Sequence, residues 1–344
     1  MKKSHNYILQ NENAVYYECG YSCDNVLYLS FGNDNFFITD GRYEIEAKLM
    51  AKNCEVIITR DLVKVAKKLL KKSKIKKLIF DPNDFTLTQY LSLSDKLDIK
   101  FIKKPNFSKL KRVIKSDDEI KLIKKAMSLG RIGFEKFALY LKKCQNQHNS
   151  EKYLQFIAKQ SMSQSGQYDL SFDPIVAISK NSAKPHALPT DNVLKSGDLL
   201  LVDAGIKYKR YCSDRTCTSY FDKDINFSRD QKFKSKKQQK VYDIVRIAQE
   251  TAIKEARVGD KASKIDKIAR DIIEKAGYSK QFVHSTGHGV GLDIHEYPNI
   301  NSKNDMIIEE NMVFTVEPGI YIVDKFGVRI EDTVVMKNGK AEVL

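Results

Sequence analysis

The sequence lacks tryptophan, and its six cysteines include no pair with the C-x-x-C spacing of a structural zinc site. We therefore expect reduced thiols rather than a zinc site or a disulfide framework. The chain also lacks any apolar run near the roughly eighteen residues that span a membrane. Two lysines near the N-terminus precede no apolar stretch, so we expect no signal peptide. These absences predict a cytoplasmic protein without a membrane partner.

Arginine is scarce as well, because only 11 of the 59 basic residues are arginine and the net charge of +15 rests on lysine. Recognition of base edges and bidentate recognition of phosphate depend mainly on arginine. The densest lysine run, residues 64–77, spaces Val65, Leu69 and Ile75 roughly along one helical face, which leaves the lysines on the solvent face. We therefore expect no nucleic-acid partner.

Two domains are predicted, at residues 1–112 and 113–344. The chain is longer than one average domain. Short strand-like runs alternate with helical runs throughout the first part, as they do in an α/β domain. Ser116 and Glu119 form a capping box, which begins a long helix and, with it, the second domain.

The second domain mixes helical and strand-rich stretches, which predicts an α+β unit. Its first helical stretch has a break at residues 145–149, and helical patterns return at 240–258 and 262–276. The parts between and after these helices are strand-like with turns. The polar and charged segment 221–239 is predicted to be a mobile surface insertion.

Two aspartates are expected to face each other across a hairpin. Asp203 and Asp214 lie in strand-like runs, and a two-residue turn at Tyr208 and Lys209 would set them opposite each other. Adjacent anions in a half-buried apolar sheet are unfavourable, and a divalent cation offsets their repulsion. The pair therefore indicates a metal site.

A second hairpin near the C-terminus repeats this arrangement. The runs NMVFTVEPGIYI and GVRIEDTVVM are predicted to pair about a turn at Asp324–Gly327, which brings Glu317 close to Glu331. Alternation along the second strand places Arg329 on the same face as Glu331. A glutamate between apolar neighbours on a buried face needs a cationic partner.

Histidines gather in two motif-like segments. His284, His288 and His295 lie in FVHSTGHGVGLDIHEYP, and His186 lies in KPHALPTD. The glycines around His288 would let the backbone pass close to a ligand or a metal. Four carboxylates and one imidazole suit two hard-to-borderline divalent ions better than one tetrahedral zinc.

These motifs, in the order D-x-G, S-D-x-T, T-G-H-G-x-G-L-x-x-H-E-x-P, E-P-G and R-I-E-D, resemble those of the pita-bread metallopeptidases. That family includes methionine aminopeptidase, Xaa-Pro aminopeptidase and Xaa-Pro dipeptidase (prolidase). The resemblance extends from about Lys111 to the C-terminus. It implies an α/β N-terminal creatinase-like domain followed by an α+β pita-bread catalytic domain.

The resemblance also implies the ligands of two divalent ions. Asp203 would bind one ion, and Asp214 and Glu331 would bridge both. His288 and Glu317 would complete the other site. Manganese is the expected metal, with cobalt and zinc as alternatives.

Hydrolysis of a peptide bond by metal-activated water is the implied reaction. Glu317 would accept the proton of that water and carry it toward the leaving nitrogen. His295 and His186 would hydrogen-bond the substrate carbonyl or the tetrahedral intermediate, and His284 would line the pocket beside them. Arg329 is a further candidate for substrate binding.

Two features resemble the proline-specific branch more than methionine aminopeptidase. A whole α/β domain precedes the catalytic one, and its stretch NFFITDGRYEIEAK is similar to that of proline peptidases and creatinase. His284 and Arg329 stand where proline-peptidase motifs have them. We expect an Xaa-Pro aminopeptidase that acts as a homodimer on peptides with proline at the second position. Prolidase is the main alternative, followed by methionine aminopeptidase and a non-catalytic binding homologue.

One departure concerns the second motif, which in the family often reads S-D-x-T-R-T. Cys217 stands here at the position of that arginine. Cys217 is not itself a predicted ligand, so we expect the exchange to alter the support behind the site or its susceptibility to oxidation.

Overall fold

The computed structural model describes residues 6–144 and 149–344. The predicted helix break at 145–149 falls mostly outside them, since residues 145–148 are not described. The chain divides into two compact units, Met1–Arg112 and Val113–Leu344.

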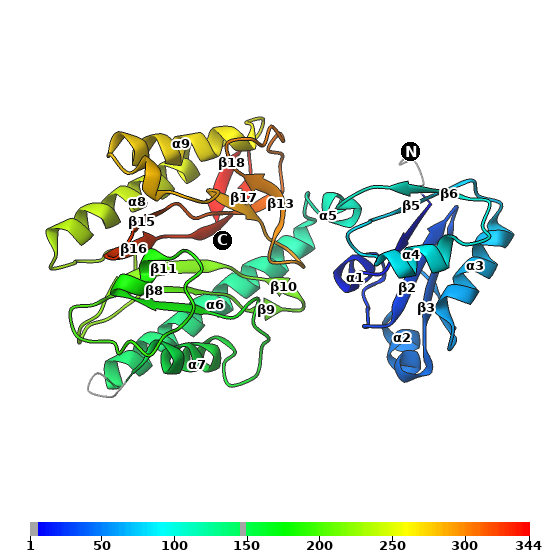
Figure 1. The fold of residues 1–344 in the computed structure, drawn as a ribbon, viewed down its shortest axis with the longest axis horizontal. Helices are drawn as coiled ribbons and strands as arrows, with labels where there is room; N and C mark the ends of the chain where they lie inside the picture. Colours follow the sequence, from blue (N-terminus) through cyan, green and yellow to red (C-terminus); the bar gives the residue numbers. More distant parts are fainter. Residues whose placement is uncertain (1–5, 145–148) are drawn as a thin grey trace. The chain divides into compact units, whose positions relative to one another are not determined.

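A six-stranded mixed sheet forms the centre of the first unit (Figure 1). Its strands are β1 (Tyr7–Leu9), β2 (Val26–Phe31), β3 (Asp34–Thr39), β4 (Glu55–Ile58), β5 (Lys77–Phe80) and β6 (Lys100–Lys103). Their spatial order is β4-β3-β2-β1-β5-β6, and β2 alone runs antiparallel to its neighbours. The helices are α1 (Glu12–Cys19), α2 (Glu44–Met50), α3 (Leu62–Ser73), α4 (Leu87–Ser94) and α5 (Phe107–Lys111), with a short 3-10 helix, η1 (Gly41–Tyr43).

Helices cover both faces of this sheet, because alternate side chains along each strand point to opposite sides. Tyr7 and Leu9 of β1 pack with Val15 of α1, and α2 and α5 join the same cluster. Ile8 packs on the other face with Leu70 of α3, and α4 joins it there. The expected α/β architecture is confirmed. The sequence pattern did not reveal β1, which is short and buried throughout.

The second unit opens with helices and continues with two sheets and two further helices. Its helices are α6 (Asp117–Lys143), α7 (Glu151–Met162), α8 (Lys236–Glu255) and α9 (Ala262–Lys275), with 3-10 helices η2 (Ser179–Ala183) and η3 (Ser279–Gln281). The expected capping box begins α6, since the Ser116 hydroxyl accepts from the Glu119 N–H at 3.2 Å and Glu119 Oε2 accepts from the Ser116 N–H at 2.8 Å. None of the described helices combines the length and the apolar character that crossing a membrane requires.

Two antiparallel sheets and two hairpins make up the remainder of this unit. The strands are β7 (Ile175–Ile178), β8 (Leu199–Ala204), β9 (Lys207–Tyr208), β10 (Tyr211–Cys212), β11 (Arg215–Tyr220), β12 (Gly287–Gly289), β13 (Glu296–Ile300), β14 (Val313–Val316), β15 (Gly319–Ile322), β16 (Phe326–Arg329), β17 (Asp332–Lys337) and β18 (Lys340–Val343). One sheet has the order β11-β8-β7 and the other the order β13-β12-β14-β17-β18, while β9 pairs with β10 and β15 with β16.

Pairs of helices pack against these sheets through two hydrophobic clusters (Figure 1). One cluster joins α8 and α9 to the five-stranded sheet and includes Val245, Ile265 and Phe314. The other joins α6 and α7 to the three-stranded sheet and includes Phe137 and Leu200. The α+β architecture expected for the second part of the chain is therefore confirmed.

The segment 221–239 differs from the mobile surface insertion that its composition predicts. Phe221 and Ile225 are 1% exposed and Phe233 is 7% exposed. The Ser219 hydroxyl of β11 donates to the Asn226 carbonyl at 2.8 Å. Charged residues dominate the composition, but the spaced apolar side chains hold the segment against the three-stranded sheet.

Candidate active site

The first hairpin carries both aspartates, but its register differs from the expected one. Its turn lies at Lys209 and Arg210, which both have positive φ, so Asp203 pairs with Thr216 and not with Asp214. Two-residue turns with positive φ at both positions are usually marked by asparagine, aspartate or glycine, and neither residue belongs to that set. The two-residue shift leaves each side chain on its original face.

The second hairpin pairs the two predicted strands and opens at the two glutamates. Its turn lies at residues 323–325 and not at the predicted Asp324–Gly327, because Phe326 and Gly327 already belong to β16. β14 pairs with β17, and β15 with β16, in one continuous antiparallel register. Between these two strand pairs, Glu317 and Glu331 do not hydrogen-bond to each other through their backbones. The Glu317 N–H instead donates to the Thr286 carbonyl at 2.7 Å, and the Glu331 N–H donates to the Thr216 carbonyl at 3.1 Å. Both carboxylates thereby enter one cavity.

β12 places His288 between its neighbours β13 and β14. A Cβ atom on Gly287 would lie 1.9 Å from the Thr315 carbonyl oxygen, and one on Gly289 would lie 2.1 Å from the Tyr297 carbonyl oxygen. These two glycines therefore allow the neighbouring strands to approach each other closely. The close approach fixes the backbone that carries His288.

A cavity of about 820 Å³ brings together all nine predicted site residues. They are His186, Asp203, Asp214, His284, His288, His295, Glu317, Arg329 and Glu331. Apolar side chains, among them Phe172, Ile175 and Leu188, complete its wall. A concave pocket with a few convergent polar groups is the usual form of a small-molecule or peptide site.

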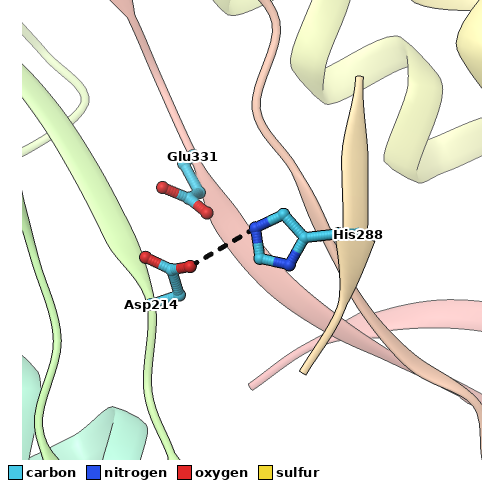
Figure 2. Close-up of side chains that lie close together, drawn as sticks. All are labelled: Asp214, His288 and Glu331. Atoms are coloured by element: carbon cyan, nitrogen blue, oxygen red, sulfur yellow. Dashed lines mark ion pairs between the residues drawn. The ribbon is translucent and has the colours of Figure 1, made fainter. Parts of the chain in front are cut away.

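Three of these side chains converge closely enough to hold one metal ion (Figure 2). One ligand atom each from Asp214, His288 and Glu331 lies within 4.8 Å of the others. His288 Nε2 is 3.6 Å from Asp214 Oδ2 and 3.4 Å from Glu317 Oε1. His288 Nδ1 donates to the Gly289 carbonyl at 3.0 Å, so in the neutral ring Nε2 keeps its lone pair toward the carboxylates.

Burial and mutual repulsion favour the neutral forms of these groups. Burial and the charge of Glu331 raise the pKa of Asp214 well above its usual range, and burial and the charge of Glu317 do the same to the pKa of Glu331. Burial raises the pKa of Glu317 to about 8. Burial also lowers the pKa of His288 to about 4. A bound cation would favour the ionised carboxylates and the neutral imidazole together.

Two buried carboxylate oxygens provide an independent sign of a cation site. Asp203 Oδ1 and Glu331 Oε1 have no hydrogen-bond partner within the described part of the chain. Buried acceptors are seldom left unpaired. The donor set of four carboxylates and one neutral imidazole therefore fits divalent cations that prefer oxygen and nitrogen ligands.

Arg329 uses four of its five N–H groups on protein atoms. Nε donates to the Thr216 hydroxyl at 3.0 Å, and Nη1 donates to the Pro185 carbonyl at 3.1 Å and to the Tyr321 hydroxyl at 2.9 Å. Nη2 forms an ion pair with Asp203 Oδ2 at 2.6 Å. The guanidinium therefore orients Asp203 directly.

Tyr321 links Arg329 to His284, and sequence reasoning missed it. His284 Nδ1 donates to the Ser285 carbonyl at 2.7 Å, so Nε2 accepts from the Tyr321 hydroxyl at 2.9 Å. Burial and the charge of Arg329 lower the pKa of His284 to about 4, which keeps this ring neutral. Side chains two residues apart on a strand lie on the same face, so counting from Glu317 through residue 319 would have placed Tyr321 on the side of the predicted ligand.

His186 and His295 are the exposed histidines of the cavity. The His295 ring packs edge-on against His288, with ring centroids 4.4 Å apart. Both rings are accessible to a molecule that enters the cavity. Both ring nitrogens of His284 have protein partners.

Two family models match this chain and together cover nearly all of it. The model of metallopeptidase family M24 matches residues 121–338. The model of the creatinase/prolidase N-terminal domain matches residues 2–120. Both agree with the resemblance noted from the motifs, which is thereby confirmed.

Relatives and solved structures agree with these models over the full chain. The chain is 33% identical to the uncharacterized peptidase YqhT of Bacillus subtilis, over 98% of this chain and 92% of that protein. Its fold is similar to the Xaa-Pro dipeptidase from Bacillus anthracis, with a TM-score of 0.89, 32% identity and coverage of 99% and 92%. The X-Pro aminopeptidase from Thermotoga maritima gives a TM-score of 0.86, 33% identity and coverage of 99% and 95%. The chain therefore belongs to metallopeptidase family M24 and carries a creatinase/prolidase N-terminal domain before its pita-bread catalytic domain.

Proposed function

We propose that this protein is a metal-dependent exopeptidase that hydrolyses the Xaa-Pro bond at the N-terminus of peptides. The observation that carries the proposal is the convergence of five ligand-type side chains and three further histidines on one cavity. The names of two structural relatives, an Xaa-Pro dipeptidase and an X-Pro aminopeptidase, support proline at the second position.

We assign the five ligands as the family resemblance implies. Asp203, Asp214, His288, Glu317 and Glu331 would hold two divalent ions through their carboxylate oxygens and the imidazole nitrogen. Manganese is the first candidate and cobalt or zinc are alternatives, because carboxylate-rich sites accept several divalent ions. When bound, such ions supply a deprotonated water near neutral pH and polarise the scissile carbonyl.

The residues of the chain then move the proton and orient the substrate. Glu317 accepts the proton of the attacking water and passes it to the proline nitrogen as the carbon–nitrogen bond breaks. A bound cation would keep this buried carboxyl ionised and therefore able to accept a proton, although burial raises its pKa to about 8 in the metal-free protein. His295 and His186 donate hydrogen bonds to the carbonyl oxygen as it gains negative charge.

His284 and Arg329 bind the substrate less directly in this proposal. His284 forms part of the wall on which the substrate packs, since both its ring nitrogens have protein partners. Arg329 holds Asp203 in place and is kept as a candidate for substrate binding because it lines the cavity.

Charge in the cavity favours an aminopeptidase over a dipeptidase. A dipeptidase must bind the free carboxylate of its substrate, and among the described residues that line the cavity Arg329 is the only lysine or arginine. Most of its N–H groups serve the protein. A longer peptide presents an amide at this position and needs no such cation.

Hydrolysis of Ala-Pro-Ala beside Ala-Pro tests the assignment. The protein is stripped with a chelator, reloaded with manganese and given each peptide separately. We expect alanine to be released from the tripeptide faster than from the dipeptide. Cleavage of the dipeptide alone would make the protein a prolidase and contradict the aminopeptidase assignment.

We also propose that the protein is a homodimer, as the resemblance to proline peptidases implies. The monomer has a mass of 39.5 kDa, so a dimer has twice that mass. Light scattering during size-exclusion chromatography measures it, and elution with the monomer mass at micromolar concentration would contradict the proposal.

A further inference from the structure

Asp332 is a buried carboxylate on the far side of the metal-binding strand. It follows Glu331 and is 7% exposed, and alternation directs its side chain away from that of Glu331. Gln249 of α8 donates to Asp332 Oδ2 at 2.8 Å. A neutral amide does not offset a buried charge by itself, so this carboxylate needs a cation.

Arg229 of segment 221–239 provides that cation. Its Nη2 atom forms an ion pair with Asp332 Oδ2, and its Nη1 atom donates to Gln249 Oε1 at 3.0 Å. The Tyr242 hydroxyl donates to the Arg229 carbonyl at 3.0 Å. Segment 221–239, which the sequence predicts to be a surface insertion, thus places the Arg229 guanidinium against Asp332, the residue that follows Glu331.

Cys217 faces the same place. Cys217, Arg229, Tyr242 and Asp332 all line one small cavity. Phe227, from the same segment, accepts a weak hydrogen bond from the Cys217 thiol at 3.7 Å. The related S-D-x-T-R-T motif has an arginine at position 217. Such an arginine would extend from the lining of this small cavity and compete with Arg229 for the carboxylate of Asp332.

We propose that Arg229 is a positioning residue for the metal site and replaces the arginine that position 217 lacks. The inference rests on the proposed function, since it assigns a role to Arg229 through the ligand Glu331. Thr216 holds Glu331 on one side, with its hydroxyl donating to Glu331 Oε2 at 2.7 Å. The pair of Arg229 and Asp332 holds the adjoining residue on the other side.

Removal of Arg229 leaves Asp332 buried and uncompensated, so the strand shifts to hydrate it and moves Glu331. Loss of a group that contacts a metal ligand directly typically lowers metal affinity about 10- to 100-fold. Arg229 acts through Asp332, which adjoins the ligand Glu331, so we expect Arg229→Ala to weaken manganese binding about 10-fold, the lower end of that range. The measurement is calorimetric titration of manganese into chelator-stripped full-length protein, with thermal unfolding to establish that the variant is folded.

Arg246→Ala is the matched control. Arg246 is 33% exposed beside 32% for Arg229, and both approach Glu250, at 3.7 Å and 3.5 Å. The ion pairs of Arg246 join it to Glu250 and Asp243, and neither of these residues adjoins a metal ligand. Its removal should leave manganese affinity unchanged.

Cys217→Arg in the Arg229→Ala background tests the replacement itself. The alanine vacates space, and the new guanidinium should restore most of the lost manganese affinity, which a general loss of packing would not allow. Should Arg229→Ala fail to fold, Arg229→Gln, which keeps a hydrogen bond but no charge, is expected to show the same loss.

Three outcomes would count against these ideas in distinct ways. A folded Arg229→Ala protein that binds manganese as tightly as the wild type would overturn the positioning role. A double variant that binds no tighter than the single one would overturn the replacement. A wild-type protein that binds none of manganese, cobalt and zinc would overturn the proposed function itself.

Discussion

Glu317 combines two tasks at the scale of a single side chain. Its carboxyl lies 3.4 Å from His288 and is hydrogen-bonded by Thr315 at 3.3 Å, and burial raises its pKa to about 8. This raised pKa describes the metal-free protein. A bound cation would favour the ionised carboxylate, which can hold the metal and accept a proton from water.

Glu317→Gln should therefore abolish most of the peptidase activity while the protein stays folded. The amide keeps the shape but cannot take a proton from water, and loss of a general base typically lowers turnover about 10²- to 10⁴-fold. Turnover of Ala-Pro-Ala at saturating manganese measures the effect, and metal content is measured in parallel. Full turnover in this variant would remove Glu317 from the role of base.

His295→Ala and His186→Ala should separate substrate activation from metal binding. Both rings are exposed in the cavity, and loss of a donor to a developing oxyanion typically costs about 10²- to 10³-fold in turnover. Manganese affinity, measured by calorimetry, should stay at the wild-type value. Loss of metal in either variant would instead identify that histidine as a ligand.

The element scale shows how strand packing holds His288. Gly287→Ala would place a methyl carbon 1.9 Å from the Thr315 carbonyl oxygen, and β12 cannot yield without breaking its pairing. We expect a loss of at least ~2 kcal/mol in unfolding free energy, together with weaker manganese binding. Gly41→Ala is the control, since a Cβ there meets nothing within 4 Å. Equal stability of the two variants would contradict this account of β12.

The order of the motifs and the alternation of side chains along strands allowed much of the catalytic unit to be predicted. The geometry of turns and the partners of residues far apart in the sequence could not be predicted from the sequence. The second hairpin was predictable because alternation places Arg329 and Glu331 on one face. The first hairpin was misread by two residues, because Lys209 and Arg210 take positive φ without the usual turn residues. The ion pair between Arg229 and Asp332 joins positions far apart in the sequence, and no local sequence pattern predicts such a pair.

At the scale of the whole molecule, the buried cluster links metal binding, pH and stability. The folded protein holds protons on Glu317, whose pKa rises from 4.5 to about 8, and the pKa of Asp214 and that of Glu331 are raised as well. His284 and His288 act in the opposite sense, because burial lowers the pKa of each from 6.5 to about 4. Above about pH 7.5 these histidines are largely neutral in both the folded and the unfolded state, and the raised carboxyl pKa values then determine the pH dependence.

The metal-free protein should therefore lose stability as the pH rises from about 7.5 to 8.5. The unfolded chain has already released the carboxyl protons in this range, while the folded chain must still release them, so the free energy of unfolding falls. Thermal unfolding of chelator-treated protein across this range measures the effect. The metal-free Glu317→Gln variant should show a shallower fall. A melting temperature that is constant or rises with pH in the metal-free wild type would contradict the account.

Metal-dependent release of alanine from Ala-Pro-Ala, measured beside Ala-Ala-Ala, is the most direct test of the central claim. The full-length protein is assayed after chelator treatment and again after manganese is restored. We predict no release before reloading, release from Ala-Pro-Ala afterwards, and little from the peptide without proline. Equal cleavage of both peptides, or no cleavage of either with manganese bound, would contradict the claim that this protein is a metal-dependent Xaa-Pro exopeptidase.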